Sequence, residues 1–582
     1  MFTTRPVLQG SFGMVASTHY LGSAVGMAVL EAGGNAVDAV VATGFTLQVA
    51  EPHLNGPGGD LPLLLQLPGA EPTVLCGQGP APAAADPAAF AARGLRAVPG
   101  AGVAAAAVPG STSAWLTLLR DHGSMDLASV LGYAVHYAET GVPVLPQIRA
   151  TIASVAGLFA DHWPSSAEIY TPGGRLPEVG SLLRNPGLAG TYRALIAAAE
   201  GREREAGIDA ALAEWTSGFV AEQVVRFCSA DQDDGTGARY PGLLTADDLA
   251  GWRPEYEAPV SGEFRGWTVF KTGPWGQGPV LLQQLAMLDG IDLEPGTAEF
   301  VHTVVEVAKL AFADRDAWYG DDPSVPLATL LSAEYSAQRR QLVGEQASFD
   351  LRPGRPDGRA PRLPTWDAVV GAEAGGGDPT VARSGVTRGD TCHIDVVDRW
   401  GTVVSATPSG GWLQSSPVIP ALGFGLGTRL QMTTLEPDLP ATLRPGRRPR
   451  TTLSPGMARA DDGRMLAFGM PGGDQQDQWQ LVFLLYHLTG GLDLQAAIDA
   501  PSFHSTHFPS SFHPREASPG TLVIERRFGD AVLDDLRRRG HRVVESDPWS
   551  LGRLSAVGHD PRTGVLTAAA NPRGMAGYAA GR

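Results

Sequence analysis

Hydrophobic residues recur at helical spacing through the first fifty residues of the chain. The stretch 16–32, ASTHYLGSAVGMAVLEA, predicts a helix that begins behind Ser17 and Thr18, which are candidate N-caps. A second helix is predicted to begin at Asn35, because Asp38 follows three residues later in the manner of a capping box. The chain therefore opens with a pair of consecutive helices.

Further along, the pattern alternates between strand and helix. Residues 55–67, NGPGGDLPLLLQL, predict a glycine turn that leads into a buried strand. Helical patterns then dominate from about 110 to 345, with a strand signal at 266–274. After Thr391 strand patterns return in HIDVVD, TVVSAT, MLAFGM, TLVIE, RVVES and VLTAAA, between helical segments. The pattern as a whole predicts an α/β (α+β) fold in which helices flank sheets.

The stretch 353–390 interrupts this pattern. It is rich in Gly and Pro and poor in periodic hydrophobic residues, which predicts a flexible linker with a seam just before Thr391. The threonine opens a strand directly after it, in RGDTCHIDVVDRWGTVVS. A strand that begins on a polar residue behind such a linker raises the question of what the threonine does.

Composition excludes several classes of function. The chain has 582 residues, 43% of them hydrophobic, which suffices for one large or two ordinary domains. A net charge of −17 argues against nucleic acid or an anionic membrane as partner. With no signal peptide and no long apolar run, we expect a cytoplasmic protein. Cys76, Cys228 and Cys392 form no CxxC pair, so we expect no disulfide framework and no metal or organic cofactor.

The common nucleophile and phosphate-binding motifs, G-x-S-x-G, the P-loop and H-E-x-x-H, are absent from the sequence. A cluster of His504, His507 and His513 lies in a loop-like stretch, which favours a structural role over a metal site. Thr391 would need a base, and its own α-amine would serve if the chain were cut after Asp390. Because many strands begin with Thr, this spacing alone is a weak indication.

Motifs in a fixed order strengthen that hypothesis. The segment GDTCHIDVVDRWGTVVSAT, residues 389–407, resembles the start of the small subunit in the gamma-glutamyltransferase family of N-terminal-nucleophile (Ntn) hydrolases. Other segments resemble the family along nearly the whole chain: EAGGNAVDAVVA, EPHLNGPGGD, AVPGS, TADDLAGW, GPWGQGPVLLQQL, ADRDAWYGDDP, GRRPRTTLSP, GMPGGDQQ and APSFHSTHFP. Each piece is modestly specific, whereas the ordered set is strong.

The resemblance implies a four-layer αββα sandwich made as one precursor. The precursor would cut itself between Asp390 and Thr391 into a large part, 1–390, and a small part, 391–582, which stay together, as a single pair or as a dimer of pairs. Thr391 would be the nucleophile and its amine the base. Ser409 would orient the threonine hydroxyl. Backbone N–H groups of the pair Gly472 and Gly473 would face the oxyanion.

The sequence differs from the family at the positions that would bind the charged groups of a gamma-glutamyl substrate. The family's arginine for the α-carboxylate is replaced by Gln78, which cannot form the charged bidentate pair. The acidic residue expected after Gln431-Met432 is lost to Thr433-Thr434. The expected substrate-binding residues are Gln78, Gly411, Trp412, Thr434, Thr451 and Thr452, the last two in place of paired serines.

These losses predict an enzyme that cleaves a small-molecule amide but is not a standard gamma-glutamyl hydrolase, which makes a role in glutathione metabolism doubtful. Trp275, Trp412 and Trp479 suggest a less polar acyl group. One alternative is a true gamma-glutamyl (glutathione) hydrolase or transferase that reads its substrate with Arg429 or Arg450. The other is an unprocessed, inactive binding protein, because Cys392 stands where the family commonly has a hydroxyl residue.

Overall fold

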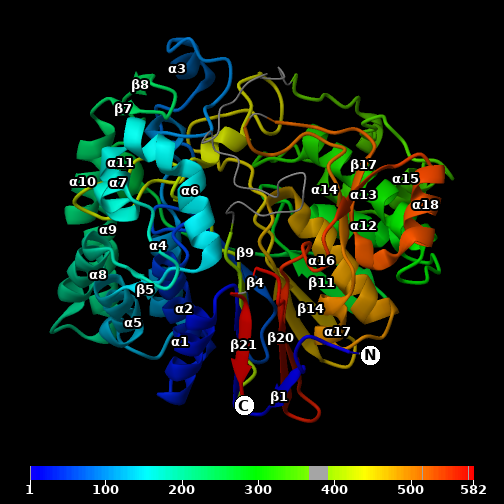
Figure 1. Cartoon of the computed structure of the whole chain (residues 1–582), viewed down its shortest axis with the longest axis horizontal. Helices are drawn as coiled ribbons and strands as arrows, with labels where there is room; N and C mark the ends of the chain where they lie inside the picture. Colours follow the sequence, from blue (N-terminus) through cyan, green and yellow to red (C-terminus); the bar gives the residue numbers. More distant parts are fainter. Residues whose placement is uncertain (1, 366–390, 514, 575) are drawn as a thin grey trace.

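The computed structural model describes residues 2–365, 391–513, 515–574 and 576–582. In this part of the chain two seven-stranded sheets lie at the centre, and each is antiparallel throughout (Figure 1). The first sheet has the order β1 (Leu8–Gly10), β20 (Val565–Ala570), β19 (Ser555–Asp560), β15 (Met465–Gly469), β14 (Gly456–Ala460), β11 (Trp267–Lys271), β10 (Val260–Phe264). The second has the order β21 (Tyr578–Gly581), β2 (Gly13–Ser17), β12 (Ile394–Asp398), β13 (Val403–Ala406), β3 (Leu61–Gln66), β4 (Thr73–Gly77), β9 (Glu255–Glu257).

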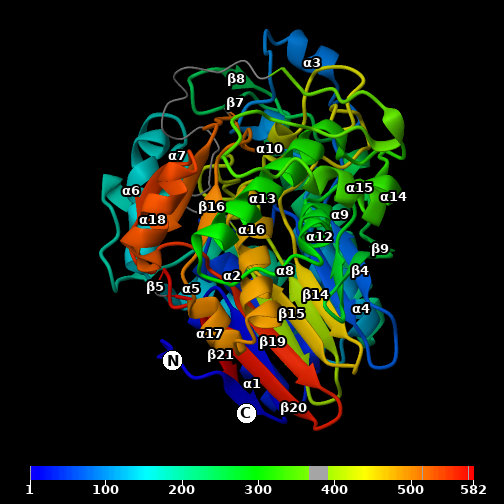
Figure 2. The same cartoon turned by 90° about the vertical axis from the view of Figure 1, so that its right-hand side faces the viewer.

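Helices cover the outer face of each sheet, and Figure 2 shows the same arrangement from the side. Those associated with the second sheet are α1 (Tyr20–Glu31), α2 (Ala36–Ala50), α4 (Ser111–His122), α5 (Leu127–Thr140), α6 (Pro146–Asp161), α7 (Pro164–Tyr170), α8 (Pro186–Ala199), α9 (Arg204–Thr216), α10 (Phe219–Cys228) and α11 (Ala246–Gly251), with the short α3 (Pro87–Ala91) beyond them. Those associated with the first sheet are α12 (Gly278–Leu288), α13 (Ala298–Trp318), α14 (Leu327–Leu330), α15 (Ala333–Arg340), α16 (Gln476–Leu484), α17 (Leu494–Asp499) and α18 (Asp530–Arg538).

Smaller elements complete the fold. A three-stranded sheet is formed by β16 (Phe503–Ser505), β17 (Thr521–Glu525) and β18 (Arg542–Ser546), and two short hairpins by β5 (Val142–Pro143) with β6 (Leu182–Leu183) and β7 (Gln232–Asp233) with β8 (Arg239–Tyr240). A π-helical turn, Leu485–Thr489, extends α16. Among the described residues, no helix is both long and apolar enough to span a bilayer.

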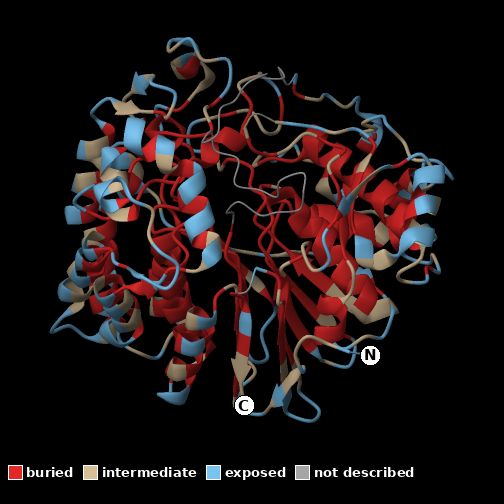
Figure 3. Cartoon of the chain, in the orientation of Figure 1, coloured by how far each residue is buried: buried red, intermediate tan, exposed pale blue. Residues whose placement is uncertain are grey.

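The hydrophobic core has three layers, seen as buried zones in Figure 3. Met14 and Val397 from the second sheet meet Met457 and Val557 from the first in the layer between the sheets. The other two layers lie between each sheet and its helices. All five residues of β12 are buried, and since alternate residues of a strand point to opposite faces, both faces of this strand are covered.

The first two helices form as the sequence predicts, with one correction. Asn35 accepts from the backbone N–H of Val37 and Asp38, and the Asp38 carboxylate accepts from the Asn35 N–H, which completes the capping box. The prediction of Ser17 or Thr18 as the first cap is wrong: Ser17 ends β2, and His19 caps α1 through Nδ1. Histidine is not among the usual N-cap residues, so the sequence pattern favours the neighbouring Ser and Thr.

The predicted linker begins as irregular chain. Residues 353–365 contain one 3-10 turn, Pro356–Gly358, and no strand. The rest of the predicted linker, with Asp390, lies outside the described residues. Where the structure resumes, at Thr391, the chain enters the middle of the second sheet.

Candidate active site

Thr391 stands just before β12, which β2 and β13 flank in the second sheet. The residue is 1% exposed, and its hydroxyl donates to Ser409 Oγ over 3.2 Å. Thr391 and Ser409 also form an antiparallel bridge, so the two hydroxyls are placed by backbone pairing. The structure therefore brings together the two hydroxyl residues that the sequence singled out.

The glycine turn at residues 55–60 is hydrogen-bonded to the backbone of Ser409. The backbone N–H groups of Asp60 and Ser409 each donate to the other's carbonyl, at 2.8 and 3.0 Å. A Cβ on Gly59 would lie 2.0 Å from the Ser409 carbonyl oxygen, so this close approach admits only glycine. The segment NGPGGD thus fixes the position of the Ser409 backbone through this pairing.

Cys392 occupies a hydrogen-bonded site that a hydroxyl group would also fit. Its thiol donates to Glu51 Oε2 at 3.2 Å and accepts from Asn55 Nδ2 at 3.0 Å. Burial raises the pKa of this thiol well above its usual value, with the Glu51 carboxylate adding to the effect. The thiol therefore stays neutral and donates a hydrogen bond to Glu51, as a hydroxyl group at this position would.

Gly472 and Gly473 form a turn between β15 and α16. Their φ angles are +131° and +50°, in the left-handed region that favours glycine. A Cβ on Gly472 would lie 2.8 Å from the ring of Trp479, which packs against the turn. The backbone at this point is thus fixed in a conformation that suits close approach to a ligand.

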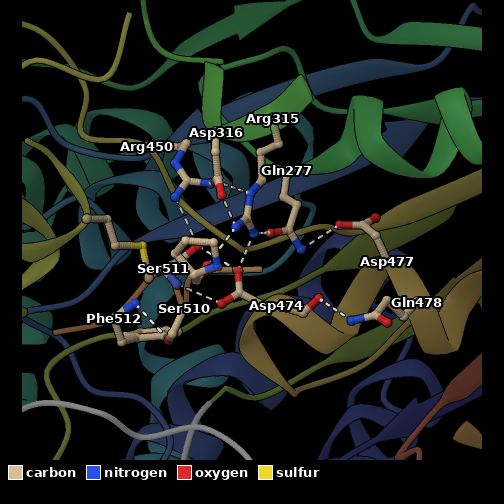
Figure 4. A network of polar contacts seen from close by, with 12 residues as sticks. Gln277, Arg315, Asp316, Arg450, Asp474, Asp477, Gln478, Ser510, Ser511 and Phe512 are labelled. Carbon is tan, nitrogen blue, oxygen red and sulfur yellow. Dashed lines mark hydrogen bonds and ion pairs between the residues drawn. The ribbon is translucent and has the colours of Figure 1, made fainter. Parts of the chain in front are cut away.

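A buried polar network holds this turn from the α16 side (Figure 4). Asp474, next to Gly473, forms an ion pair with Arg315 and accepts from the backbone and hydroxyl of Ser511 at 2.7 and 2.6 Å. Arg315 also donates to Asp316 at 2.9 Å and to Gln277 at 2.7 Å. Ion pairing with Arg315 lowers the pKa of Asp474 against the effect of burial. The segment GPWGQG resembles the family, but its sequence gives no sign that Gln277 connects the start of α12 to this turn.

The predicted substrate-binding residues fall into two groups. Both amide atoms of Gln78 and the hydroxyl of Thr452 are buried without a hydrogen-bond partner among the described residues. By contrast, the Thr451 hydroxyl accepts from the Leu453 N–H, and that of Thr434 from the Glu436 N–H. Because buried polar groups are normally paired, the Gln78 amide and the Thr452 hydroxyl are the strongest candidates for contact with a ligand.

Gly411 and Trp412 border a narrow pocket that Asn55 and Phe424 also line. Gly411 has φ +65°, and a Cβ there would lie 3.2 Å from the Gly425 carbonyl oxygen. Trp412 packs with Phe512 and lies under the Arg429 guanidinium. Arg429 is itself bound by both carboxylate oxygens of Asp60, at 2.6 and 2.8 Å.

The predicted histidine cluster does not converge. His504 meets the edge of Trp479, His507 contacts the Asp350 carbonyl and the Gly520 N–H, and the His513 N–H donates to Gln431. The sequence did not point to a second group, His302, Glu306 and His541, whose ligand atoms lie within 4.8 Å of one another. There the Lys309 ammonium pairs with Glu306 at 2.5 Å, so a cation already occupies the carboxylate.

The chain is similar to known proteins along nearly its whole length. The family model for gamma-glutamyltranspeptidase matches residues 22–581. The oxamate amidohydrolase proenzyme of Klebsiella pneumoniae is 30% identical over 581 residues, covering 98% of each chain. A solved structure with the designation LmbA2991 is 57% identical, with a TM-score of 0.95 and 100% of both chains covered. The crystal structure of cephalosporin acylase from Bacillus halodurans is 30% identical, with a TM-score of 0.82, and covers 100% of this chain and 97% of that one.

Proposed function

This chain belongs to the gamma-glutamyltranspeptidase family, and from that premise we propose that it is a self-processing amidohydrolase or acyltransferase with Thr391 as nucleophile. The observation that carries the proposal is the buried Thr391 hydroxyl at the head of β12, 3.2 Å from Ser409 Oγ. The two facing sheets and their outer helices would be the four-layer αββα sandwich of Ntn hydrolases. Processing would divide the chain into 1–390 and 391–582.

The first reaction would be the chain's own cleavage. Attack of Thr391 Oγ1 on the Asp390 carbonyl carbon forms an ester and breaks the peptide C–N bond, while the hydroxyl proton passes to the freed α-amine. Water then hydrolyses the ester, leaving a carboxylate at Asp390 and a free amine and hydroxyl on Thr391. The new amine, whose ordinary pKa is about 7.7–8.0, is a suitable base at neutral pH.

The same groups would then act on a substrate amide. Thr391 Oγ1 attacks the substrate carbonyl, the α-amine takes the hydroxyl proton and gives it to the leaving amine, and water or another amine releases the acyl group. Ser409 would orient the nucleophile. The N–H groups of Gly472 and Gly473 would stabilise the oxyanion, supported by the buried pair Asp474–Arg315.

The acyl group is proposed to differ from gamma-glutamyl. Gln78 cannot replace the charge of an arginine, and Thr434 carries no carboxylate for an α-ammonium. Some relatives are named for other amides, as oxamate amidohydrolase and cephalosporin acylase are, while others are named glutathione hydrolases. Gln78, Gly411, Trp412, Thr434, Thr451 and Thr452 are the proposed substrate-binding residues.

The alternative of a true gamma-glutamyl enzyme requires another arginine to read the substrate. Arg429 is a poor candidate, since Asp60 already holds its guanidinium in a bidentate pair. Hydrolysis of gamma-glutamyl-p-nitroanilide, measured beside oxamate and a cephalosporin amide, would separate this alternative from the main proposal.

The decisive experiment is the denatured mass of freshly purified protein. We expect two fragments that correspond to 1–390 and 391–582 in place of one chain of 60.9 kDa. Thr391→Ala should remain intact, whereas Thr391→Ser, which keeps a hydroxyl, should still be cut. An intact wild-type chain that persists on incubation would refute the mechanism and leave the unprocessed binding protein as the better reading.

A further inference from the structure

The loop of residues 51–60 contacts the chain around both hydroxyls of the candidate site. Its glycine turn is hydrogen-bonded to the backbone of Ser409. The same loop also binds the side chain of Cys392, the residue that follows Thr391. A single segment therefore holds the surroundings of the nucleophile as well as those of its hydroxyl neighbour.

The Cys392 side chain is held by two residues of this loop. Because adjacent residues of an extended chain point to opposite sides, this side chain is directed away from the Thr391 hydroxyl. Its Sγ donates to Glu51 Oε2 at 3.2 Å and accepts from Asn55 Nδ2 at 3.0 Å. The Asn55 amide also donates to the Leu47 carbonyl at 3.1 Å, which fixes its orientation. The thiol is thus anchored to the end of α2.

The Glu51 carboxylate binds a second part of the chain through the same oxygen. Its Oε2 also accepts from Thr18 Oγ1, at 2.6 Å. Thr18 follows the end of β2, and its backbone N–H donates to the His393 carbonyl at 3.2 Å. One carboxylate oxygen therefore joins the end of β2 to the residues that open β12.

This position is unfavourable for a carboxylate. Glu51 is the C-cap of α2, where the helix dipole favours a cation, and it is 4% exposed. Burial raises its pKa above the ordinary value, against the hydrogen bonds from Thr18 and Cys392 and the Arg553 cation. A neutral side chain would avoid both penalties. Because perturbed carboxylates of this kind concentrate at functional sites, Glu51 is a candidate for a role in the reaction.

We propose that Glu51 and Asn55 are positioning residues that act through the Cys392 side chain. They hold Thr391 in the orientation from which its hydroxyl attacks the Asp390 carbonyl. The inference rests on the proposed function and deepens it, because it assigns the geometry of self-cleavage to particular side chains. Neither residue touches the reacting atoms; their effect arises because a displacement of about 1 Å can slow an attack about 100-fold.

Self-cleavage is the measurement, because the reacting bond belongs to the chain itself and no external substrate is needed. The uncut chain is made by cell-free translation, and the appearance of the two fragments is followed by mass. Cys392→Ala, which removes the thiol, should slow cleavage about 10–100-fold. Cys392→Ser, which restores a hydrogen-bond donor and acceptor, should recover most of the wild-type rate.

Variants of the loop test whether the effect passes through the thiol. Glu51→Gln keeps the size of the side chain but loses its charge, and should slow cleavage about 10-fold. Combined with Cys392→Ala it should add little further loss, because both changes break the same hydrogen bond. Asn55→Asp turns the donating amide into an acceptor and should also slow cleavage. Cys228→Ala, which removes a buried thiol from α10, is the matched control and should be cut at the wild-type rate.

The possible outcomes separate the inference from the proposed function. Wild-type cleavage rates in Cys392→Ala and Glu51→Gln would overturn the positioning role. Equal rates in Cys392→Ser and Cys392→Ala would do the same, since lost packing would then explain the effect. If the melting temperature shows that Cys392→Ala does not fold, the rate of Glu51→Gln decides. A wild-type chain that stays uncut would instead refute the proposed function, and this inference with it.

Discussion

At the scale of single residues, the contact between Thr391 and Ser409 makes a sharp prediction. Ser409→Ala removes the hydroxyl that accepts from Thr391 Oγ1 at 3.2 Å and leaves the backbone bridge in place. We expect self-cleavage and amide hydrolysis to slow by about 10–100-fold with little change in stability, as for the loss of one orienting hydrogen bond. Time-resolved mass analysis of the uncut chain measures this, and cleavage at the wild-type rate would exclude the orienting role.

Gly472 makes a second prediction, on stability. Gly472 and Gly33 both have positive φ, +131° and +100°, but a Cβ on Gly472 meets Trp479 at 2.8 Å, whereas one on Gly33 meets nothing within 4 Å. Gly472→Ala should therefore cost about 1–3 kcal/mol more than Gly33→Ala, because only it adds overpacking to backbone strain. Urea denaturation of the two variants gives the difference, and equal losses would show that the Trp479 contact yields freely.

Residue identities that follow a motif were readable from the sequence, while their partners were not. The ordered motifs singled out Thr391 and Ser409, which the structure brings into contact. Neither the Cys392–Glu51 hydrogen bond nor the Arg315–Asp474 ion pair could be foreseen, because each joins segments far apart in the chain. Trp275 is one of three tryptophans that favour a less polar acyl group. Its indole N–H donates to the Glu257 carboxylate, however, and its ring lies against the Arg448 guanidinium.

At the scale of elements, the start of α2 is the clearest test. Asn35 Oδ1 accepts two backbone N–H groups, and its amide also donates to the His122 carbonyl at 2.8 Å. Asn35→Ala should lower the free energy of unfolding by about 1–2 kcal/mol, because a capping oxygen is lost at the end of a fully buried helix. Asn35→Ser, which keeps an accepting oxygen, should recover a good part of that loss; equal losses would mean that the His122 contact dominates.

Long periodic segments were predicted well and short strands poorly. The helices α1, α2, α4, α13 and α18 and the strands β12, β13, β15, β17 and β20 lie where the pattern places them. The edge strands β1 and β9 are only three residues long and carry no recognisable alternation. Their pairing is decided by the neighbouring strand, which a local pattern cannot reveal.

At the scale of the whole molecule, buried histidines predict a loss of stability in mild acid. Burial lowers the pKa of His53 and His504 to about 3 and that of His19 to about 4, against 6.5 for an unfolded histidine. A depressed pKa means that the unfolded chain takes up the proton first, so stability is full above pH 6.5 and falls as the pH drops toward 4. At pH 5 each such histidine contributes about 2 kcal/mol of destabilisation.

A variant isolates this effect from other titrating groups. His504→Phe removes one of these protonations, so its free energy of unfolding should fall between pH 7 and pH 5 by about 2 kcal/mol less than that of wild type. The same change at His136, on the exposed face of α5, is the matched control. If the free energies of unfolding of wild type and His504→Phe fell equally between pH 7 and pH 5, the pKa of His504 would be the same in the folded and unfolded chains, contrary to this prediction.

The general architecture was within reach of the sequence, and the strand order was not. Mixed sheets with outer helices follow from the alternating patterns, and the family is evident from the ordered motifs. However, pairing β12 with β2 joins residues nearly four hundred positions apart, and β1 pairs with β20 across a still longer separation. Such long-range registers are set by tertiary packing and leave no local trace.

The order of strands has a consequence for how the two pieces of the chain come to be present in equal amounts. A cut before Thr391 would leave β2 between β21 and β12, and β11 beside β14, so that each sheet is woven from both pieces. Among the described residues, five strand pairings join the two pieces, β1–β20, β11–β14, β2–β21, β2–β12 and β3–β13, and all of them would have to break before the pieces could separate. If the chain is cut there, translation as a single precursor would supply the two pieces in equal number and already paired, without matched expression of two genes.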